Sequence, residues 1–232
     1  EMQRSLVGSE MCIRDRYTDI ETQLKQRTIN ISKFGIGAEL FVKGLAKKVL
    51  LADNLSVLYS SICGHPQMSV FTSWLGILAY TMQLYFDFSG YSDMAIGLGK
   101  MLGFDFNKNF DYPYISTSVS EFWRRWHISL GSWFRDYIYI PLGGNRVSTL
   151  KHIRNILVVW ALTGLWHGAS WNFVLWGVYY GLFLLLEKFV LQKYLKKIPS
   201  WLCTVYTMLV VMIGWVSVSY THLRAHETTL HL

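Results

Sequence analysis

A histidine lies inside the longest apolar run of the chain, which extends from Ile153 to Leu186. The pentapeptide Leu165-Trp-His-Gly-Ala169 places His167 within this run, whose length and low charge are typical of a membrane segment. An ionisable side chain at membrane depth is costly and therefore indicates a function. Because imidazole is the side chain best suited to proton transfer near neutral pH, His167 is the first candidate for that chemistry.

The residues around His167 allow two interpretations of its role. The ring could be a buried, neutral imidazole that is hydrogen-bonded to an adjacent helix. Alternatively, the small residues Gly164 and Gly168 leave little bulk near the ring, so that a substrate chain could approach it. Glycines at this spacing also serve plain helix packing.

His127 is the second candidate, at the end of the string Trp123-Arg-Arg-Trp-His127. The adjacent Arg124 and Arg125 disfavour a protonated ring, so we expect a neutral imidazole. Taken by itself, the residue is more simply interpreted as an interfacial histidine among arginines.

Three carboxylates, Asp87, Asp93 and Asp105, lie next to apolar segments. We expect them to pair with arginines or to cap a helix break at Ser89-Gly90 rather than to act as catalytic acids. The three cysteines form no CxxC pair, and no HExxH, nucleotide loop or nucleophile elbow occurs. The sequence therefore predicts no metal site, no disulfide and no bound cofactor.

The composition indicates the kind of protein that positions these residues. Of the 232 residues, 52% are hydrophobic, 16% are aromatic and only 16% are charged, which favours a polytopic helical membrane protein. The net charge of +7 comes from short basic clusters between apolar runs. That placement fits cytoplasmic loops beside anionic lipid and argues against a nucleic-acid partner.

The chain divides into several expected helical segments. An amphipathic helix over Thr18–Ser61 is followed by a span over Val70–Phe88, a break at Ser89-Gly90 and a short piece over Tyr91–Phe104 that is either closely packed or re-entrant. The aromatic and arginine-rich stretch from Glu121 to Ile140 predicts an interfacial or protein-buried helix. One more membrane helix is expected from Trp201 to Val216.

Basic clusters on both sides of the His167 run predict a helical hairpin with both ends cytoplasmic. The 13 residues from Arg154 to His167 correspond to roughly 20 Å of helix. In a hydrocarbon core about 30 Å thick, His167 would then lie beyond the membrane midplane, as seen from the basic side.

Both ends of the sequence differ in character from its middle. Residues 1–16 and 217–232 resemble translated sequencing-adapter read-through, and we expect the first of these segments to be disordered. On this interpretation residues 17–216 form one domain of a longer protein, and the tail histidines His222, His226 and His231 are not metal ligands.

Four motifs in order resemble the membrane-bound O-acyltransferase family, in particular its alginate O-acetyltransferase-like branch. The motifs begin at Gln83-Leu-Tyr-Phe-Asp-Phe-Ser-Gly-Tyr, Phe122-Trp-Arg-Arg-Trp-His127, Trp133-Phe-Arg-Asp-Tyr and Leu165-Trp-His-Gly-Ala169, and the resemblance covers roughly Thr28 to Val216. It implies an all-α fold in which transmembrane and re-entrant or interfacial helices form a ring, here partial, around a tunnel. It also implies that His167 is the catalytic histidine and His127 the second active-site histidine.

The resemblance implies a multi-pass protein of the bacterial inner membrane that moves an acetyl group from a cytoplasmic thioester, acetyl-CoA or an acyl carrier, to hydroxyls of an exported polysaccharide. That acceptor would be reached directly or through a periplasmic acetyltransferase partner. Our hypothesis is that His167 removes the hydroxyl proton while His127 positions or polarises the thioester carbonyl. The alternatives are D-alanyl or longer acyl transfer, a membrane transporter, and a scaffold for a periplasmic enzyme.

Overall fold

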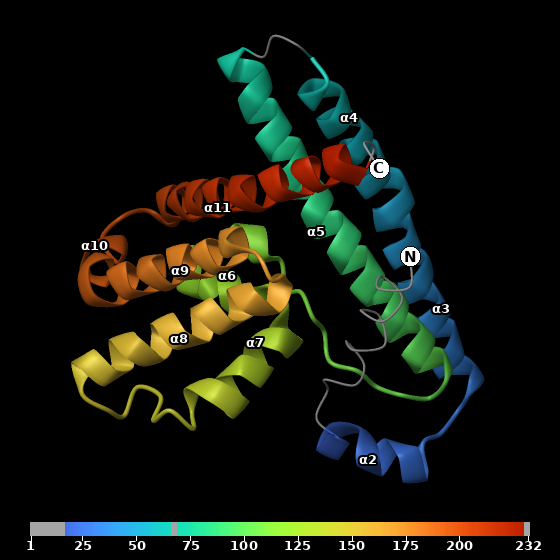
Figure 1. The fold of residues 1–232 in the computed structure, drawn as a ribbon. Helices are drawn as coiled ribbons and strands as arrows, with labels where there is room; N and C mark the ends of the chain where they lie inside the picture. The colour runs from blue at the N-terminus through green and yellow to red at the C-terminus, as the bar shows by residue number, and fades with distance from the viewer. Residues whose placement is uncertain (1–16, 66–68, 230–232) are drawn as a thin grey trace. The chain divides into compact units, whose positions relative to one another are not determined.

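The computed structural model describes residues 17–65 and 69–229, with side chains described for 20–65 and 69–216. All of these residues lie in helices or in the loops that join them, which confirms the predicted all-α class for the described part of the chain. Figure 1 shows the order of the helices. The artefact predicted for residues 1–16 lies outside the described residues, and that for 217–232 stays a prediction.

The chain forms two compact units. The first contains the described residues up to Asp111 together with His127–Leu130, and the second contains Tyr112–Trp126 and the residues from Gly131 onward. The helices of the first unit are α2 (Tyr17–Gln26), α3 (Ile31–Ala46), the π-helical η1 (Lys47–Ala52), α4 (Asp53–Cys63) and α5 (Val70–Met101). The continuous helical run from α3 through α4 packs beside α5, as Figure 1 shows.

Glycines allow α3 and α5 to pack with their backbones in contact. A Cβ atom added to Gly37 would lie 2.6 Å from the carbonyl oxygen of Gly97, and one added to Gly44 would lie 2.5 Å from that of Gly90. The reverse approaches are as close. Close packing through small residues is how helices associate where lipid removes the hydrophobic driving force.

The prediction of a helix break at Ser89-Gly90 is wrong, because α5 runs without interruption from Val70 to Met101. Both residues are buried inside this helix. Gly90 meets the backbone of Gly44, and Gly97 meets that of Gly37, so these glycines serve helix packing rather than a turn. Of the two alternatives for Tyr91–Phe104, the closely packed helix is the one observed.

The carboxylates of the first unit pair with lysines instead of the expected arginines. Lys48 lies 2.7 Å from Asp87 and Lys47 lies 2.6 Å from Asp93, so both pairs join η1 to α5. The loop residue Asp105 is bound by Lys33 at 2.6 Å. Lys47 and Lys48 therefore cross-link the helical run from α3 through α4 to α5, and Lys33 links it to the loop that follows α5.

The second unit contains the shorter helices and the predicted hairpin. Its elements are the 3-10 turn η2 (Pro113–Ile115), α6 (Val119–Arg125), α7 (Ile128–Phe134, whose first three residues belong to the first unit), the π-helical η3 (Arg135–Tyr139), α8 (Thr149–His167), α9 (Trp171–Leu186), the π-helical η4 (Glu187–Leu191), α10 (Gln192–Leu195) and α11 (Ser200–Thr229). Helices α8 and α9 form the hairpin that the basic clusters predict. The helix expected over Glu121–Ile140 is interrupted at Trp126 and His127.

An aromatic cluster forms the core of the second unit. Trp123 of α6 lies at its centre, with ring centroids 4.8 Å from Trp160, 4.7 Å from Tyr180 and 6.1 Å from Trp215. The fourth tryptophan, Trp176 of α9, lies 5.7 Å from Trp123 and is 3% exposed. Edge-to-face contacts of this kind contribute about 0.5–1.5 kcal/mol each beyond the burial of their area.

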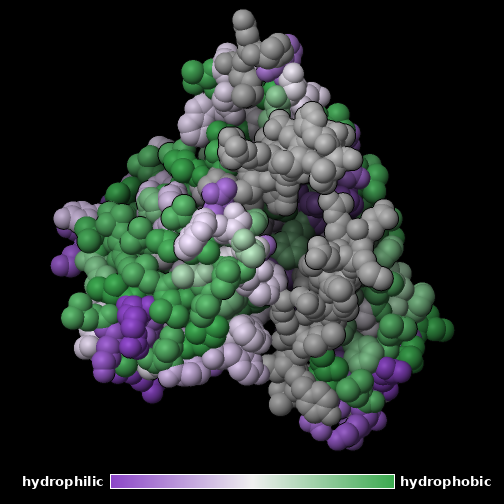
Figure 2. Space-filling view, in the orientation of Figure 1, coloured by the Kyte–Doolittle hydropathy of each residue, from purple (hydrophilic) through white to green (hydrophobic). Residues whose placement is uncertain are grey.

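Among the described residues, one helical stretch is long and apolar enough to cross a membrane, and it covers Trp171–Leu195. The apolar helix Ser200–Val216 is shorter than this stretch. The segment Val70–Phe88, which we expected to span the membrane, does not meet the same requirements of length and apolar character. Many large apolar side chains are exposed on the helices of both units. Figure 2 shows hydrophobic atoms over much of the visible surface, as expected for helices that face lipid.

Candidate functional site

His127 occupies the irregular position between α6 and α7, in the first unit. Its backbone is left-handed, with φ of 47°, a conformation that costs an L-residue about 1–2 kcal/mol. The residue is only 5% exposed, and its ring meets that of Phe88 on α5 edge to face at 4.8 Å. His127 is thus a buried histidine at a strained turn rather than an exposed interfacial one, and strain of this kind concentrates at functional sites.

Asn109 holds the segment that carries His127. Its side-chain Oδ1 lies 3.2 Å from His127 Nδ1 and accepts hydrogen bonds from the backbone N–H and the hydroxyl of Ser129, both at 3.0 Å. The backbone carbonyl of Asn109 accepts from the N–H of Ile128 at 2.9 Å. Asn109 is itself 5% exposed, so its hydrogen bond with His127 is buried, while those from Ser129 are partly buried.

His167 is the last residue of α8, at the tip of the hairpin in the second unit. It is exposed, so the alternative of a buried imidazole is not the one observed. Its ring contacts Trp176 of α9 edge to face at a centroid distance of 5.0 Å, and Phe173 lies 6.3 Å away. The 13 residues back to Arg154 form one continuous helix, as the predicted depth of His167 requires.

The glycines near His167 pack the hairpin. A Cβ atom on Gly164 would overlap the backbone of Phe173, and one on Gly168 would come within 2.6 Å of the Phe173 ring. On the opposite helix, Gly177 meets the carbonyl of Trp160 in the same way. Of the two explanations for Gly164 and Gly168, helix packing is therefore the one observed.

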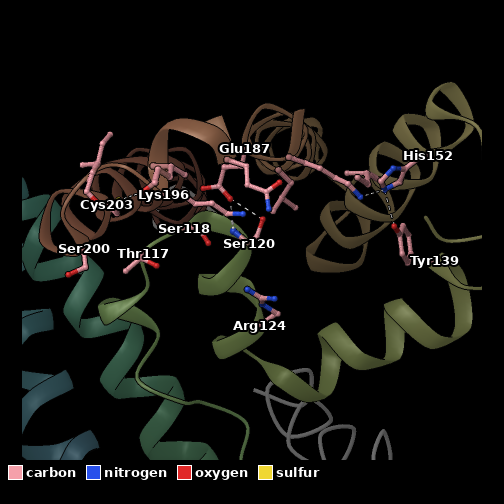
Figure 3. Close-up of a pocket in the computed structure, with 16 residues that line it drawn as sticks. Thr117, Ser118, Ser120, Arg124, Tyr139, His152, Glu187, Lys196, Ser200 and Cys203 are labelled. Carbon is pink, nitrogen blue, oxygen red and sulfur yellow. Dashed lines mark hydrogen bonds between the residues drawn. The ribbon is translucent and has the colours of Figure 1, made fainter. Parts of the chain in front are cut away.

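A pocket of about 630 Å³ lies in the second unit, and Figure 3 shows it. Neither His127 nor His167 is among its lining residues. These residues are Thr117, Ser118, Ser120, Arg124, Tyr139, His152, Ile156, Leu184, Glu187, Lys188, Gln192, Leu195, Lys196, Ile198, Ser200 and Cys203. His127 and His167 are therefore described as separate candidate residues, one in each unit, and the pocket's one carboxylate has a structural role.

That carboxylate, Glu187, is 4% exposed and binds the start of α6. It accepts hydrogen bonds from the N–H groups of Val119 at 2.6 Å and Ser120 at 2.9 Å, and from the Ser120 hydroxyl at 2.9 Å. Carboxylates stabilise the positive end of a helix, so Glu187 fastens α9 and η4 to α6. Elsewhere in the pocket, His152 Nε2 lies 3.0 Å from the Tyr139 hydroxyl and 3.1 Å from Lys188 Nζ, as Figure 3 shows in part.

Sequence reasoning did not single out Asn109 or Glu187. Glu187 could have been found, because it is an acidic residue within an apolar stretch that is long enough to span a membrane, and such residues need a partner. Asn109 carries no comparable signal, since it precedes His127 by 18 positions in an irregular segment.

Within the residues that the structure describes, no group of three His, Cys, Asp or Glu side chains could hold a metal ion. The side chains of the tail histidines His222, His226 and His231 lie outside that part of the chain.

The sequence was compared with known proteins and protein families. The model of the membrane-bound O-acyltransferase family matches residues 12–223. The chain belongs to this family. As a membrane-bound O-acyltransferase family member it is expected to lie in a membrane, in agreement with the exposed apolar helices.

Several curated members of the family resemble this chain. It is 49% identical over 201 residues to a probable alginate O-acetylase, AlgI, of Azotobacter vinelandii, a match that covers 87% of this chain and 40% of the relative. A peptidoglycan O-acetyltransferase of Helicobacter pylori is 36% identical over 209 residues, with 86% and 39% covered. A teichoic acid D-alanyltransferase of Bacillus subtilis is 31% identical over 166 residues, with 68% and 40% covered. The chain thus spans about two fifths of the length of these relatives.

Proposed function

We propose that this chain is part of a membrane O-acetyltransferase that moves an acetyl group from a cytoplasmic thioester to hydroxyl groups of an exported polysaccharide. The observation that carries the proposal is the 49% identity to a probable alginate O-acetylase across 87% of the chain. Family membership and the likeness to a peptidoglycan O-acetyltransferase support the same reaction class.

In this proposal His167 is the general base. Its ring takes the proton of a sugar hydroxyl while the hydroxyl oxygen attacks the thioester carbonyl carbon. The new C–O bond forms, the C–S bond breaks, and the departing sulfur recovers the proton from the imidazolium. A base positioned in this way accelerates such a reaction by roughly 10²- to 10⁴-fold. The exposure of His167 supports access for reactants to the ring.

His127 is proposed as the second active-site histidine, a role that the family resemblance implies. Its burial and its left-handed backbone support a functional assignment, since a strained buried histidine is retained only where its surroundings hold it.

The proposed setting is the bacterial inner membrane, with several helices crossing it and with the basic ends of the α8–α9 hairpin at the cytoplasm. The excess of lysine and arginine beside the hairpin supports this orientation. The donor would be acetyl-CoA or an acylated carrier protein. The acceptor would be met outside the membrane, directly or through a periplasmic acetyltransferase.

A chimera tests the proposal. This chain replaces the matched segment of the Azotobacter vinelandii relative, and the chimera is supplied to an alginate-producing bacterium that lacks its own O-acetylase. Cells are fed labelled acetate, and ester-linked label is measured on the secreted polysaccharide. We expect labelled esters to appear. Transport of label without ester formation would overturn the proposal in favour of a transporter.

The same cells separate the remaining alternatives. A scaffold predicts that esters form unchanged when His127 or His167 is replaced, because the chemistry would occur on a partner. The likeness to a D-alanyltransferase makes D-alanine the alternative acyl group, so parallel cultures receive labelled D-alanine. Label from D-alanine in place of acetate would reassign the transferred acyl group.

A further inference from the structure

The pocket of the second unit carries more positive than negative charge. Among its lining residues, Arg124 comes from α6, Lys188 comes from η4 and Lys196 follows α10, and Figure 3 shows Arg124 and Lys196. The pocket's one carboxylate, Glu187, is bound by N–H groups at the start of α6. In the part of the chain that the structure describes, no carboxylate pairs with Arg124, Lys188 or Lys196. The three cations therefore line a cavity that supplies them with no counter-charge.

One wall of the pocket also has more hydrogen-bond donors than acceptors. His152 is 5% exposed, and its Nε2 lies 3.0 Å from the Tyr139 hydroxyl oxygen and 3.1 Å from Lys188 Nζ. An ammonium group can only donate, and an unprotonated ring nitrogen offers a single lone pair, for which the ammonium and the hydroxyl compete. If Nε2 is protonated instead, it offers Lys188 no acceptor at all. In either state a donor is left for an acceptor that the ligand of the pocket would supply.

The elements around the pocket have the residues of a membrane surface. The apolar stretch Trp171–Leu195 ends directly before Lys196. The aromatic residues Tyr194 of α10 and Trp201 of α11 are exposed close to it in the chain, and tyrosine and tryptophan are enriched where membrane helices meet the lipid headgroups. The pocket lining itself includes the apolar side chain of Ile198, which is also exposed. The cations of the pocket are thus expected at headgroup level.

The pocket lies at the opposite end of α8 from His167. His152, which lines the pocket, belongs to the first turn of α8, and His167 is the last residue of that helix. The 15 residues between these positions correspond to roughly 22 Å of helix. A group bound beside His152 therefore does not contact the His167 ring, and the pocket is a site of its own.

A phosphate group has the chemistry that this pocket lacks. It brings negative charge and several acceptor oxygens, and arginine and lysine are the side chains that bind it most often. Basic pockets between membrane helices bind anionic lipid headgroups in this way. A phospholipid would also cover apolar surface with its acyl chains, and Leu186, Val190 and Leu202 are exposed on the elements that border the pocket. A soluble phosphate has no such chains.

We propose that this pocket binds the phosphate group of an anionic phospholipid, with Arg124, Lys188 and Lys196 as its cationic contacts and with the acyl chains on the adjoining apolar surface of the helices. The site is independent of the proposed acyl transfer, because it requires only a membrane around the chain. Inorganic phosphate and coenzyme A offer the same charged group without lipid chains, so the test compares these sources.

Native mass spectrometry of the chain, purified in a nonionic detergent, counts the lipid molecules that remain bound. The probes are phosphatidylglycerol, diacylglycerol with the same acyl chains but no phosphate, inorganic phosphate and coenzyme A. We expect saturable retention of phosphatidylglycerol, no retention of diacylglycerol, and displacement of the lipid only by a large excess of either soluble phosphate compound. Equal retention of diacylglycerol, or no retention of phosphatidylglycerol, would overturn the proposal. Displacement by micromolar coenzyme A or phosphate would assign the pocket to a soluble ligand and overturn the lipid assignment.

Matched substitutions show whether the lipid occupies this pocket. Lys188→Gln and Lys196→Gln remove lining cations, whereas Lys193→Gln and Lys197→Gln remove exposed cations of the same basic segment that do not line the pocket. We expect each pocket variant to weaken phosphatidylglycerol binding roughly five-fold, as a basic residue beside an anionic headgroup contributes about that factor. The two controls should weaken it less than about two-fold, since exposed surface charges contribute little. Equal weakening in all four variants would show general attraction to a basic surface and would contradict the pocket.

Thermal melting excludes misfolding as the cause of lost binding. Without lipid, Lys188→Gln should melt at the same temperature as the unsubstituted chain or slightly higher, because it removes an exposed cation from an uncompensated cluster. Phosphatidylglycerol should raise the melting temperature of the unsubstituted chain, since a ligand of the folded state stabilises it. It should raise that of Lys188→Gln less, and an equal rise would contradict the proposal. Lipid binding by a chain whose chimera forms no acetyl esters would leave this site standing while the proposed function fails.

Discussion

The two units hold their histidines by different physical means. In the first unit His127 is buried at a strained turn and is fixed by hydrogen bonds to Asn109. In the second unit His167 is exposed at a helix end, and its ring contacts the aromatic ring of Trp176 edge to face. Hydrogen bonds restrict both the orientation and the proton position of a ring, whereas an aromatic contact restricts only its orientation. The first arrangement suits a positioning group and the second suits a group that takes up and releases a proton.

The two units also differ in the kinds of contact that hold their helices together. Glycine contacts and lysine–aspartate pairs join α3 and η1 to α5 in the first unit. Aromatic contacts around Trp123 and the buried Glu187 join α6, α8, α9 and α11 in the second. Substitutions that remove one kind of contact should therefore affect the units to different extents.

The largest stability effect is expected at the aromatic core of the second unit. Trp176→Ala should lower the free energy of unfolding by about 3–5 kcal/mol, because it removes a buried ring and leaves a cavity. Trp201→Ala is the matched control, since Trp201 is 65% exposed. Denaturant unfolding in detergent measures both, and equal losses would show that the cluster does not dominate the stability of this unit.

Removal of the buried carboxylate should have the next largest effect. Glu187→Leu leaves the N–H groups of Val119 and Ser120 without their acceptor, and an unsatisfied buried polar group costs about 1–3 kcal/mol. Glu187→Gln retains one acceptor oxygen and should lose less. The control is Glu21→Gln, on a surface pair with Lys25. Equal unfolding free energies for Glu187→Leu and Glu21→Gln would contradict the capping role.

A single methyl group tests the glycine contacts of the first unit. Gly97→Ala should lower the free energy of unfolding by about 1–3 kcal/mol, because the new Cβ meets the backbone of Gly37 and the helices must separate. Gly35→Ala has open space around its Cβ position and should be neutral or stabilise by up to about 1 kcal/mol. Thermal melting of the two variants compares them directly, and similar melting temperatures would count against close packing.

The smallest effect is expected at Asp105. The hydrogen bond from Lys33 holds the pKa of the Asp105 carboxyl below its usual range. Because the folded-state pKa is lowered, the pair stabilises the fold above the unfolded pKa, and this stability is lost as pH falls through the folded pKa. Asp105→Asn should therefore cost a few tenths of a kcal/mol near neutral pH, since the pair is partly exposed. The difference from the unsubstituted chain should disappear in acid, and a difference that grew there would reverse the sign of the linkage.

Local patterns in the sequence were sufficient for part of this structure. The apolar run with basic flanks predicted the α8–α9 hairpin, and glycine spacing gave a closely packed helix around Gly97 as one of two alternatives, the other being a re-entrant segment. Local patterns gave the wrong prediction at Ser89-Gly90. This pair often interrupts a helix, but here it remains helical where α5 packs against α3. Tertiary packing against Gly44 decides the outcome there, and no local pattern contains it.

The sequence was likewise sufficient to predict only some of the residues at the two candidate histidines. His167 could be proposed from residue type and surroundings, because an ionisable group in an apolar segment is conspicuous, whereas the role proposed for His127 came only from the family resemblance. The partner of His127 could not be predicted, since Asn109 reaches it only after the chain has folded back across 18 residues. The lysine partners of Asp87 and Asp93 were likewise mistaken for arginines, since the pairing depends on how α5 lies against η1.

Acetyl transfer by the chimera carrying His167→Ala tests the central claim most directly. His65→Ala is the control, an exposed histidine in the loop after α4. With protein levels matched by immunoblot, we expect the His167 variant to form ester-linked acetyl at least about 10²-fold more slowly, as loss of a general base requires, while the His65 variant matches the unsubstituted chimera. Equal rates in the two variants would contradict the assignment of His167 as the base.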